Sequence, residues 1–333
     1  MITSQAQTRP ALKRGLVYVK RSDGYFVGRR EGGLLFLEEL ASLVLPLLTG
    51  KYTGREIALL LDQNGSNQAE DAVMEIINQL DQAQMLDHDA PSASGNENWP
   101  ELSMVTHRSG VQDGGRKVLA NRATARVDIY GCGLIGANLA RILAASGIGE
   151  LRLIDARIIS SQHLPVTSLA SVGLNAATEV ASSLARDYPK VLARTVKEPT
   201  LAIVTRPPSP SEILTFMNFS KAHLLIEPRG DSIEVGPLVL PGRSSCLRCL
   251  TLDRLDHDSN WYSVELCGQL EHEPPAALAA LAAGISALAA LSLVDSAEPK
   301  SVSLVDTTLR IDADLRISAT PRRRHPRCGC AWG

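Results

Sequence analysis

The sequence predicts an α/β protein in which a small α+β domain precedes a larger domain built on a parallel sheet. Three patterns in the 333 residues support this class: short strands and helices over Ala11–Asp89, a strand, glycine turn, helix and strand over 127–155, and two cysteine pairs far apart in the chain. A chain of this length is long enough for two or three domains. We expect domains at 1–89 and 123–333, with a linker and lead-in at 90–122.

The first expected domain begins with strands and continues with helices. The segment "GLVYVKRSDGYFVGRREGGLLFLEE" is broken at an Asp-Gly and a Gly-Gly pair, which is typical of hairpin turns. Three helical segments follow, and Thr53 with Glu56 three residues later predicts a capping box at the start of the second. Strands followed by three short helices indicate a winged-helix-like α+β domain. The segment "APSASGNEN" at 90–98 then has the composition of a linker.

The larger domain carries a strand-to-helix turn rich in glycine. A strand over Val127–Tyr130 runs directly into Gly131, Gly133 and Gly136, and a second strand ends at Asp155. Such glycines let a phosphate approach the N-terminus of the following helix, and a carboxylate in the position of Asp155 accepts hydrogen bonds from a ribose. The pattern predicts a Rossmann-like domain with these four residues as a candidate nucleotide site. Glycine turns also serve plain strand-to-helix packing, so nucleotide binding is one of two interpretations.

Four cysteines are expected to form one metal site. Cys246 and Cys249 are separated by two residues in "CLRC", and Cys328 and Cys330 by one residue in "CGC". Two short chelating turns from distant segments supply the four soft ligands that tetrahedral Zn²⁺ prefers, and four thiolates leave no open position for water. The sequence therefore predicts a structural zinc site. A redox role would need a thioredoxin-like context, which this segment lacks, and His325 is a spare ligand candidate.

Composition favours a cytoplasmic protein without a membrane anchor. The chain has six cysteines, a net charge of -2 and no apolar presequence in "MITSQAQTRPALKRG". The weak negative charge offers no general attraction to nucleic acid. The uncharged, alanine-rich segment Pro275–Val294 reaches the length of a membrane span, but its composition favours a helix buried in the core or in a homodimer interface. Cys132 and Cys267 are expected to be small buried residues.

The cysteine segments and the glycine turn together resemble a known superfamily. The strings "VGPLVLPGRSSCLRCLTLDRLDHD" and "RRRHPRCGC", with the turn at Gly131 and the strand ending at Asp155, are similar to ThiF-like, ubiquitin-activating-type adenylyltransferases. Within that superfamily they resemble the branch associated with bacteriocin and azole-peptide cyclodehydratases. The resemblance covers Ala123–Cys330. It implies an adenylyltransferase-type Rossmann domain, and in that branch an N-terminal winged-helix-like domain clamps the leader of a ribosomally made precursor peptide.

Active members of the superfamily bind ATP and Mg²⁺ and adenylate the C-terminal carboxylate of a small protein or peptide. The glycines and Asp155 match their pattern, but the acid expected two residues later is Arg157. The family's S-N-L-x-R-Q segment falls on "QHLPVT", with Val166 in place of arginine and Thr167 in place of glutamine. The expected lysine is missing from "VGLNA", and the metal-binding aspartate from "VTRPPSPS". Positioned charges supply most of the catalysis in this superfamily. Because these charges are missing, no residue is assigned as catalytic, and zinc is a stronger cofactor candidate than ATP.

These patterns favour a non-catalytic protein that binds a precursor or leader peptide and presents it to a partner modifying enzyme, such as a cyclodehydratase. The peptide is expected to add as a strand near Leu34–Leu37, beside a helix over Ala69–Met85. One alternative is an ATP-dependent adenylyltransferase whose site is rebuilt from Arg157, Arg141 or Arg206. Another is a DNA-binding regulator, and in a third the first domain only packs against the Rossmann-like domain.

Overall fold

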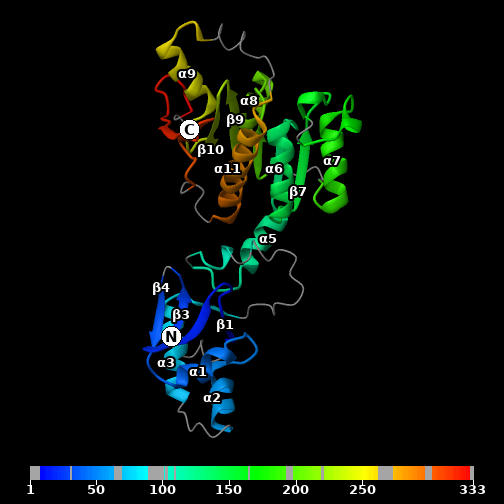
Figure 1. Ribbon diagram of the computed structural model, residues 1–333. Coiled ribbons are helices and arrows are strands. Elements are labelled where there is room, and N and C mark those ends of the chain that lie inside the picture. The colour runs from blue at the N-terminus through cyan, green and yellow to red at the C-terminus, as the bar shows by residue number, and fades with distance from the viewer. Residues whose placement is uncertain are drawn as a thin grey trace. The chain divides into compact units, whose positions relative to one another are not determined.

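The computed structural model describes residues 8–30, 32–63, 70–88, 101, 104–108, 110–163, 166–192, 198–218, 221–261, 273–296 and 302–330. The chain divides into two compact units, Met1–Ala120 and Asn121–Gly333 (Figure 1). The first unit therefore extends past the predicted domain 1–89 into the predicted lead-in. The linker expected at 90–98 lies outside the described residues.

The described part of the first unit contains two small antiparallel sheets and several helices. Its strands are β1 (Pro10–Leu12), β2 (Val17–Arg21), β3 (Gly24–Arg29), β4 (Gly32–Phe36) and β5 (Leu86–His88). Its helices are α1 (Leu40–Val44), the 3-10 turn η2 (Leu45–Leu47), α2 (Gly54–Gln63) and α3 (Glu70–Gln82). Strands β2, β3 and β4 pair in this order, and β1 pairs with β5. The hairpins followed by three helices have the predicted order, to which β1 and β5 are added.

Local sequence explains how these helices begin and end. The N–H of Glu56 donates to Thr53 Oγ1 at 3.2 Å, and the N–H of Thr53 donates to the Glu56 carboxylate at 2.8 Å, which is the predicted capping box. Pro46 lacks an N–H, and the first helix tightens into the 3-10 turn η2 around it. Strands β3 and β4 and the three helices then share one apolar core, which includes Val27, Phe36, Val44, Ile57 and Leu80.

Part of the predicted lead-in is attached to the first unit. The N–H of His88 in β5 donates to the carbonyl of Gln112 at 2.5 Å. The side-chain amide of Gln112 donates to Asp81 at 2.8 Å, and the ring of His88 lies 2.8 Å from the same carboxylate. These contacts fix the segment around Gln112 on α3 and β5.

The second unit is built on a seven-stranded mixed sheet. Its strands are β6 (Arg126–Tyr130), β7 (Glu150–Ile154), β8 (Leu201–Val204), β9 (His223–Arg229), β10 (Ser232–Val239), β11 (Thr307–Asp312) and β12 (Ile317–Pro321). They lie in the order β12-β11-β10-β9-β8-β6-β7, parallel from β6 to β9 and antiparallel from β10 to β12. Because β7 and β8 lie on opposite sides of β6, the strand order reverses at the carboxyl end of β6. Open α/β sheets bind ligands at such a point.

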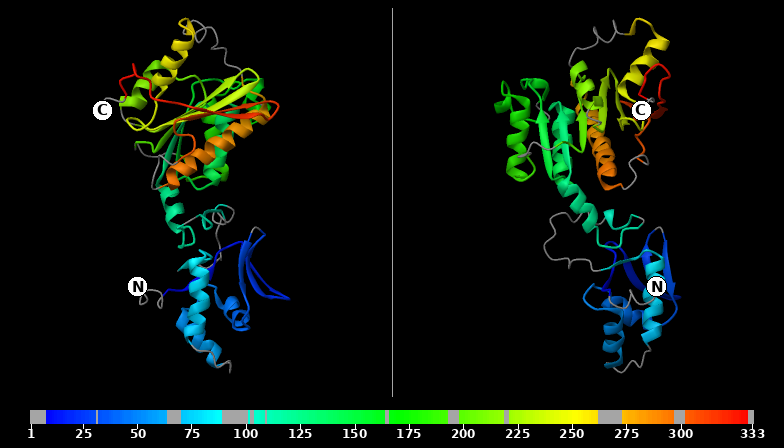
Figure 2. Two further views of the ribbon diagram at one scale, coloured as in Figure 1. Left: turned by 90° about the vertical axis from the view of Figure 1, so that its left-hand side faces the viewer. Right: turned by 180° about the vertical axis from the view of Figure 1, so that it is seen from behind.

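Helices cover both faces of this sheet. They are α6 (Leu134–Ala145), α7 (Ala176–Asp187), α8 (Pro210–Asn218), α9 (Leu247–His257) and α11 (Ala276–Asp295), with short 3-10 turns η3 (Ser161–His163) and η4 (Leu169–Ser171), while α5 (Arg116–Thr124) crosses the boundary between the units. In β8, Leu201 and Ile203 pack in the core formed with α6, α7 and α11. The alternate residues Ala202 and Val204 pack with α8 and α9 on the other face. Figures 1 and 2 show α6 and α11 side by side on one face of the sheet.

Helix α11 is the apolar segment expected at 275–294. It is long and apolar enough to cross a membrane, but 56% of its most apolar window is buried inside the protein. Its small side chains pack in the core with α6 and β10, so the close helix packing that its alanines allow occurs within the chain. This position agrees with the expected core helix. A homodimer stays a prediction.

A buried ion pair joins the end of α11 to the segment before β6. Arg122 donates from Nε and Nη2 to the two carboxylate oxygens of Asp295 at 2.9 and 2.8 Å, and from Nη1 to the carbonyl of Ser146 at 3.0 Å. The two charged side chains are only 2% and 1% exposed. Because both charges are desolvated, loss of one partner leaves the other in the interior with less compensation.

We therefore expect Asp295→Ala to lower the free energy of unfolding by about 3–5 kcal/mol, because the Arg122 guanidinium stays buried after its carboxylate partner is removed. Asp187→Ala is the matched control, since Asp187 pairs with Arg141 at 2.9 Å on a half-exposed surface. Such a pair contributes less than about 1 kcal/mol. Urea unfolding followed by circular dichroism measures both variants. Equal, small losses would contradict a structural role for the buried pair.

Candidate anion site and cysteine cluster

The glycine turn between β6 and α6 has the geometry expected of a phosphate-binding turn. Gly131 has a φ of +108°, which residues with side chains rarely adopt. A Cβ on Gly136 would lie 1.8 Å from the carbonyl oxygen of Gly131, so this position has no room for a side chain. The turn places the N-terminus of α6, with Gly133 as its N-cap, at the carboxyl end of β6. A helix N-terminus in this position favours an anion.

Asp155 follows β7, and protein donors engage its carboxylate. One carboxylate oxygen accepts the N–H of Cys132 at 2.6 Å, and the other accepts the N–H of Arg157 at 2.9 Å. The Arg157 guanidinium also donates to this carboxylate, at 2.8 Å. Burial acts to raise the pKa of Asp155, but the hydrogen bonds from Arg157 and Cys132 outweigh it and hold the pKa below its ordinary value. The arginine that replaces the expected acid thus neutralises the predicted ribose ligand.

A second carboxylate, that of Glu273, lies at the N-terminus of α6. Its Oε2 accepts the N–H of Leu134, the first residue of the helix, at 2.7 Å. Its Oε1 lies 3.6 Å from Arg157 Nη1 and 3.4 Å from His163 Nε2. Arg157 therefore contacts the carboxylates of both Asp155 and Glu273. We refer to the glycine turn, these two acids, Arg157 and His163 as the anion site.

Other positions expected to carry catalytic charge are apolar, polar or paired. Val166 and Thr167 line a cavity of about 330 Å³ together with residues of α6 and α7. Arg141, which also lines this cavity, pairs with an aspartate of α7 at 2.9 Å. Arg206, in the segment that was expected to hold the metal-binding aspartate, pairs with Glu212 of α8 at 2.6 Å. Each of the three arginines considered for a rebuilt site is thus bound to a carboxylate.

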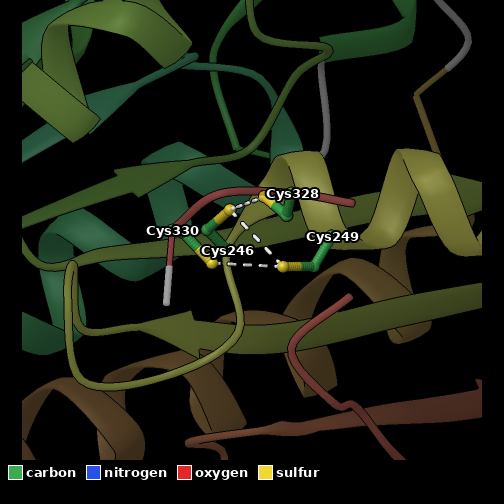
Figure 3. A group of neighbouring side chains, drawn as sticks. All are labelled: Cys246, Cys249, Cys328 and Cys330. Carbon is green, nitrogen blue, oxygen red and sulfur yellow. Dashed lines mark hydrogen bonds between the residues drawn. The ribbon is translucent and has the colours of Figure 1, made fainter. Parts of the chain in front are cut away.

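The four predicted metal ligands meet at one point. Cys246 and Cys249 come from the start of α9, and Cys328 and Cys330 from the segment after β12 (Figure 3). All four Sγ atoms lie within 4.8 Å of one another. The separation is 3.7 Å for Cys246 and Cys249, and 3.4 Å for each contact between the two segments. A disulfide bond would be about 2.05 Å long, so these are four free thiols in one cluster.

The cluster fits Zn²⁺ by donor type and by spacing. Zn–S bonds of about 2.3 Å in a tetrahedron put the sulfur atoms about 3.8 Å apart, close to the separations in the cluster. Burial raises the pKa of Cys246 to about 11. Burial acts in the same direction at Cys249, but the N–H groups of Cys246 and His325 lower its pKa overall. A bound cation would deprotonate all four thiols, and four thiolates would make the metal structural.

Ion pairs hold the chain around the cysteine cluster. The ring of His325, predicted as a spare ligand, turns to Asp256 of α9 at 2.8 Å, and the N–H of His325 donates to Cys249 Sγ at 3.3 Å. Arg327 also pairs with Asp256. Acidic residues that follow the first cysteine pair therefore bind basic residues beside the second pair.

Two acids of these sites were not found from the sequence. Glu273 stands in a short polar segment ahead of the alanine-rich helix α11, and Glu212 is an ordinary first-turn acid of α8. Nothing in their local sequence relates either residue to the glycine turn. Cys132 is buried as predicted, and burial followed by the charge of Asp155 raises its pKa to about 12, which keeps the thiol protonated. Cys267 lies outside the described residues.

The second unit thus places a glycine turn at the switch point of its sheet and gathers four cysteines in one cluster. Solved structures with a similar fold include MccB of E. coli, a microcin C7 biosynthetic enzyme. MccB with AMPCPP and MccA is 17% identical to this chain, with 97% of this chain and 99% of MccB covered and a TM-score of 0.71. MccB with ATP is 18% identical, with 96% and 99% covered and a TM-score of 0.69. PaaA is 15% identical, with 80% and 95% covered and a TM-score of 0.65.

At these identities the likeness establishes the fold. The predicted α/β class is confirmed by it, and the chain has the fold of MccB over nearly its whole length. No family model and no curated protein matches the sequence.

Metal analysis of the purified protein should find about one zinc per chain, held by the cysteine cluster. We expect Cys249→Ser to lose most of this zinc and to lower Tm by roughly 10 °C, because the free energy of metal coordination contributes directly to folding. Cys132→Ser is the matched control, since Cys132 is equally buried but lies outside the cluster. Wild-type protein without zinc, or Cys249→Ser protein that keeps it, would refute the assignment.

Proposed function

We propose that this chain is a non-catalytic ThiF-like protein of the cytoplasm that binds a precursor or leader peptide and presents it to a partner modifying enzyme, such as a cyclodehydratase. The observation that carries the proposal is the pairing of the arginines considered for a rebuilt site. Arg157 is bound to Asp155, and Arg206 to Glu212, while Arg141 is bound to α7. Adenylation depends on charges that are positioned for the developing charge of the transition state. Arginines already neutralised by carboxylates do not supply them.

The first unit supports the peptide-binding part of the proposal. Strand β4 ends its three-stranded sheet, and the described part of the chain places no further strand beside it. Leu35 and Leu37 at this edge are 41% and 77% exposed. An extended peptide pairs with such an edge through backbone hydrogen bonds, and exposed apolar side chains add specificity. Helix α3 shares one core with β4, and MccB, with the same fold, has been solved with the peptide MccA.

An ATP-dependent adenylyltransferase is the second candidate. The glycine turn is intact, Asp155 stands at the expected place, and MccB has been solved with ATP. In this alternative ATP would have to displace the carboxylate of Glu273 from the N-terminus of α6 and separate Arg157 from Asp155. The peptide-binding protein and the adenylyltransferase therefore differ in one property: only the adenylyltransferase would bind ATP at the anion site and use it in a reaction.

Peptide binding is tested with the full chain and fluorescein-labelled peptides from short reading frames beside its gene, by fluorescence polarisation. We expect saturable binding to one of them. Leu35→Asp should weaken it at least about tenfold, because the substitution puts a charge on the apolar edge that the peptide joins. Val19→Asp is the matched control, since Val19 lies on the opposite edge strand and is 49% exposed. No saturable binding to any such peptide, or equal weakening by both variants, would count against the proposed edge.

Catalysis is tested by exchange of radiolabelled pyrophosphate into ATP in the presence of the same peptides. We expect the wild-type rate to equal that of Asp155→Ala, because a functioning site would lose about 10²- to 10³-fold when one positioned group is removed. A wild-type rate far above that of the variant would favour the adenylyltransferase.

A further inference from the structure

We infer that Glu273 is an internal anion whose carboxylate occupies the place of a nucleotide phosphate at the N-terminus of α6 and excludes polyphosphate ligands from the anion site. The inference goes beyond the proposed function, because it concerns the ligand of the second unit and does not depend on peptide binding. It rests on the space beside Gly133, on the buried ring of His163 and on the charges around Arg157.

The space that the carboxylate fills exists because residue 133 is a glycine. A Cβ on Gly133 would lie 2.0 Å from Glu273 Oε1 and 2.5 Å from its carboxyl carbon. In phosphate-binding turns a missing side chain lets a phosphate approach the backbone. In this chain the same space holds a carboxylate, which accepts the first N–H of α6 from Leu134 at 2.7 Å. Glu273 thus takes the hydrogen bond that a phosphate oxygen would take.

His163 is an independent sign that this place is built for an anion. The residue is 4% exposed, and its Nδ1 accepts the backbone N–H of Ser160 at 3.0 Å. When Nδ1 accepts this N–H, the ring proton is on Nε2; the carbonyl of Ser160 lies farther from Nδ1, at 3.3 Å. Among the described residues Nε2 has no hydrogen-bond partner, and it lies 3.4 Å from Glu273 Oε1. A buried N–H directed at this position favours a bound negative charge.

With Glu273 in place, the charges of the site sum to about half a negative charge. Asp155 and Glu273 each contribute one negative charge, against the positive charge of Arg157 and about half a charge from the N-terminus of α6. A pyrophosphate added to this arrangement would lie next to two carboxylates. Removal of the Glu273 carboxylate would free three donors: the Leu134 N–H, His163 Nε2 and Arg157. Together these donors form a set suited to phosphate.

The backbone around Glu273 tethers this carboxylate to the site. The N–H of Glu273 donates to Gln162 Oε1 at 3.3 Å, and α11 begins three residues later. A tethered group competes at a much higher effective concentration than a free ligand of the same charge. A nucleotide therefore meets a site that is already filled.

The test is titration of inorganic pyrophosphate into the full-length protein by isothermal titration calorimetry. We expect Glu273→Ala to bind pyrophosphate at least about tenfold more tightly than wild type, because the competing anion is removed and its donors are freed. Glu273→Gln should fall between them, since its amide oxygen still accepts the Leu134 N–H without carrying charge. Glu227→Ala is the matched control, because Glu227 is also an ion-paired, mostly buried acid of the second unit but lies away from the glycine turn. Glu227→Ala should bind pyrophosphate with the affinity of wild type. Because it removes the same negative charge at another place in the unit, it shows whether the gain in affinity depends on position or on net charge.

Equal affinities of wild type and both Glu273 variants would overturn the inference, whether all of them bind pyrophosphate or none does. A gain of the same size in Glu227→Ala would overturn it too. Zinc content and Tm show that each variant is folded, and Glu273→Gln keeps the test valid where Glu273→Ala is unstable. Peptide binding is not part of the readout, so failure of the proposed function and failure of this inference give different results.

Discussion

The hydrogen bond from the N–H of Leu134 to the carboxylate of Glu273 connects segments that are 139 residues apart. The glycines of the turn bring the N-terminus of α6 to the carboxyl end of β6, and that position needs an anion. The chain supplies the anion from the segment that leads into α11. At the other end of α11, Asp295 binds Arg122 ahead of β6. The helix that covers the centre of the sheet is therefore attached at both ends to the same strand-turn-helix unit, and between these two polar contacts it packs against α6 through the apolar core.

The reversal of charge at residue 157 explains how two acids are tolerated in one small space. Arg157 lies against Asp155 and within 3.6 Å of Glu273, so neither carboxylate is left without a positive neighbour. Sites that act on a ligand usually keep charges that only the ligand or the transition state satisfies. In this chain Arg157 pairs with both Asp155 and Glu273. The fold is shared with MccB.

Features that depend on local sequence were predictable, and those that depend on distant contacts were not. The period of the strands, the three glycines and Asp155 are enough to predict β6, α6 and β7. The capping box of Thr53 and the spacing within each cysteine pair are likewise local signals, and the preference of Zn²⁺ for four soft ligands predicts that the two pairs meet. The position of Glu273 depends on contacts with Leu134, Arg157 and Gln162, which are far away in the sequence and which no periodicity encodes. The attachment of Gln112 to β5 depends on side chains of α3 in the same way.

The cysteine cluster joins residues 81 and 82 positions apart, and the intervening chain contains α11 and the antiparallel strands β11 and β12. Contacts among the four cysteines close this long loop. A closed loop gains less conformational entropy when it unfolds, so the closure opposes unfolding of this half of the sheet. The parallel strands β6 to β9 are held by their own pairing and by α6 and α7. If the cluster holds zinc, loss of the metal would loosen the half of the unit that contains β12 and α9, and amide exchange and proteolysis would begin there. The lifetime of this protein in a cell would then follow the supply of zinc.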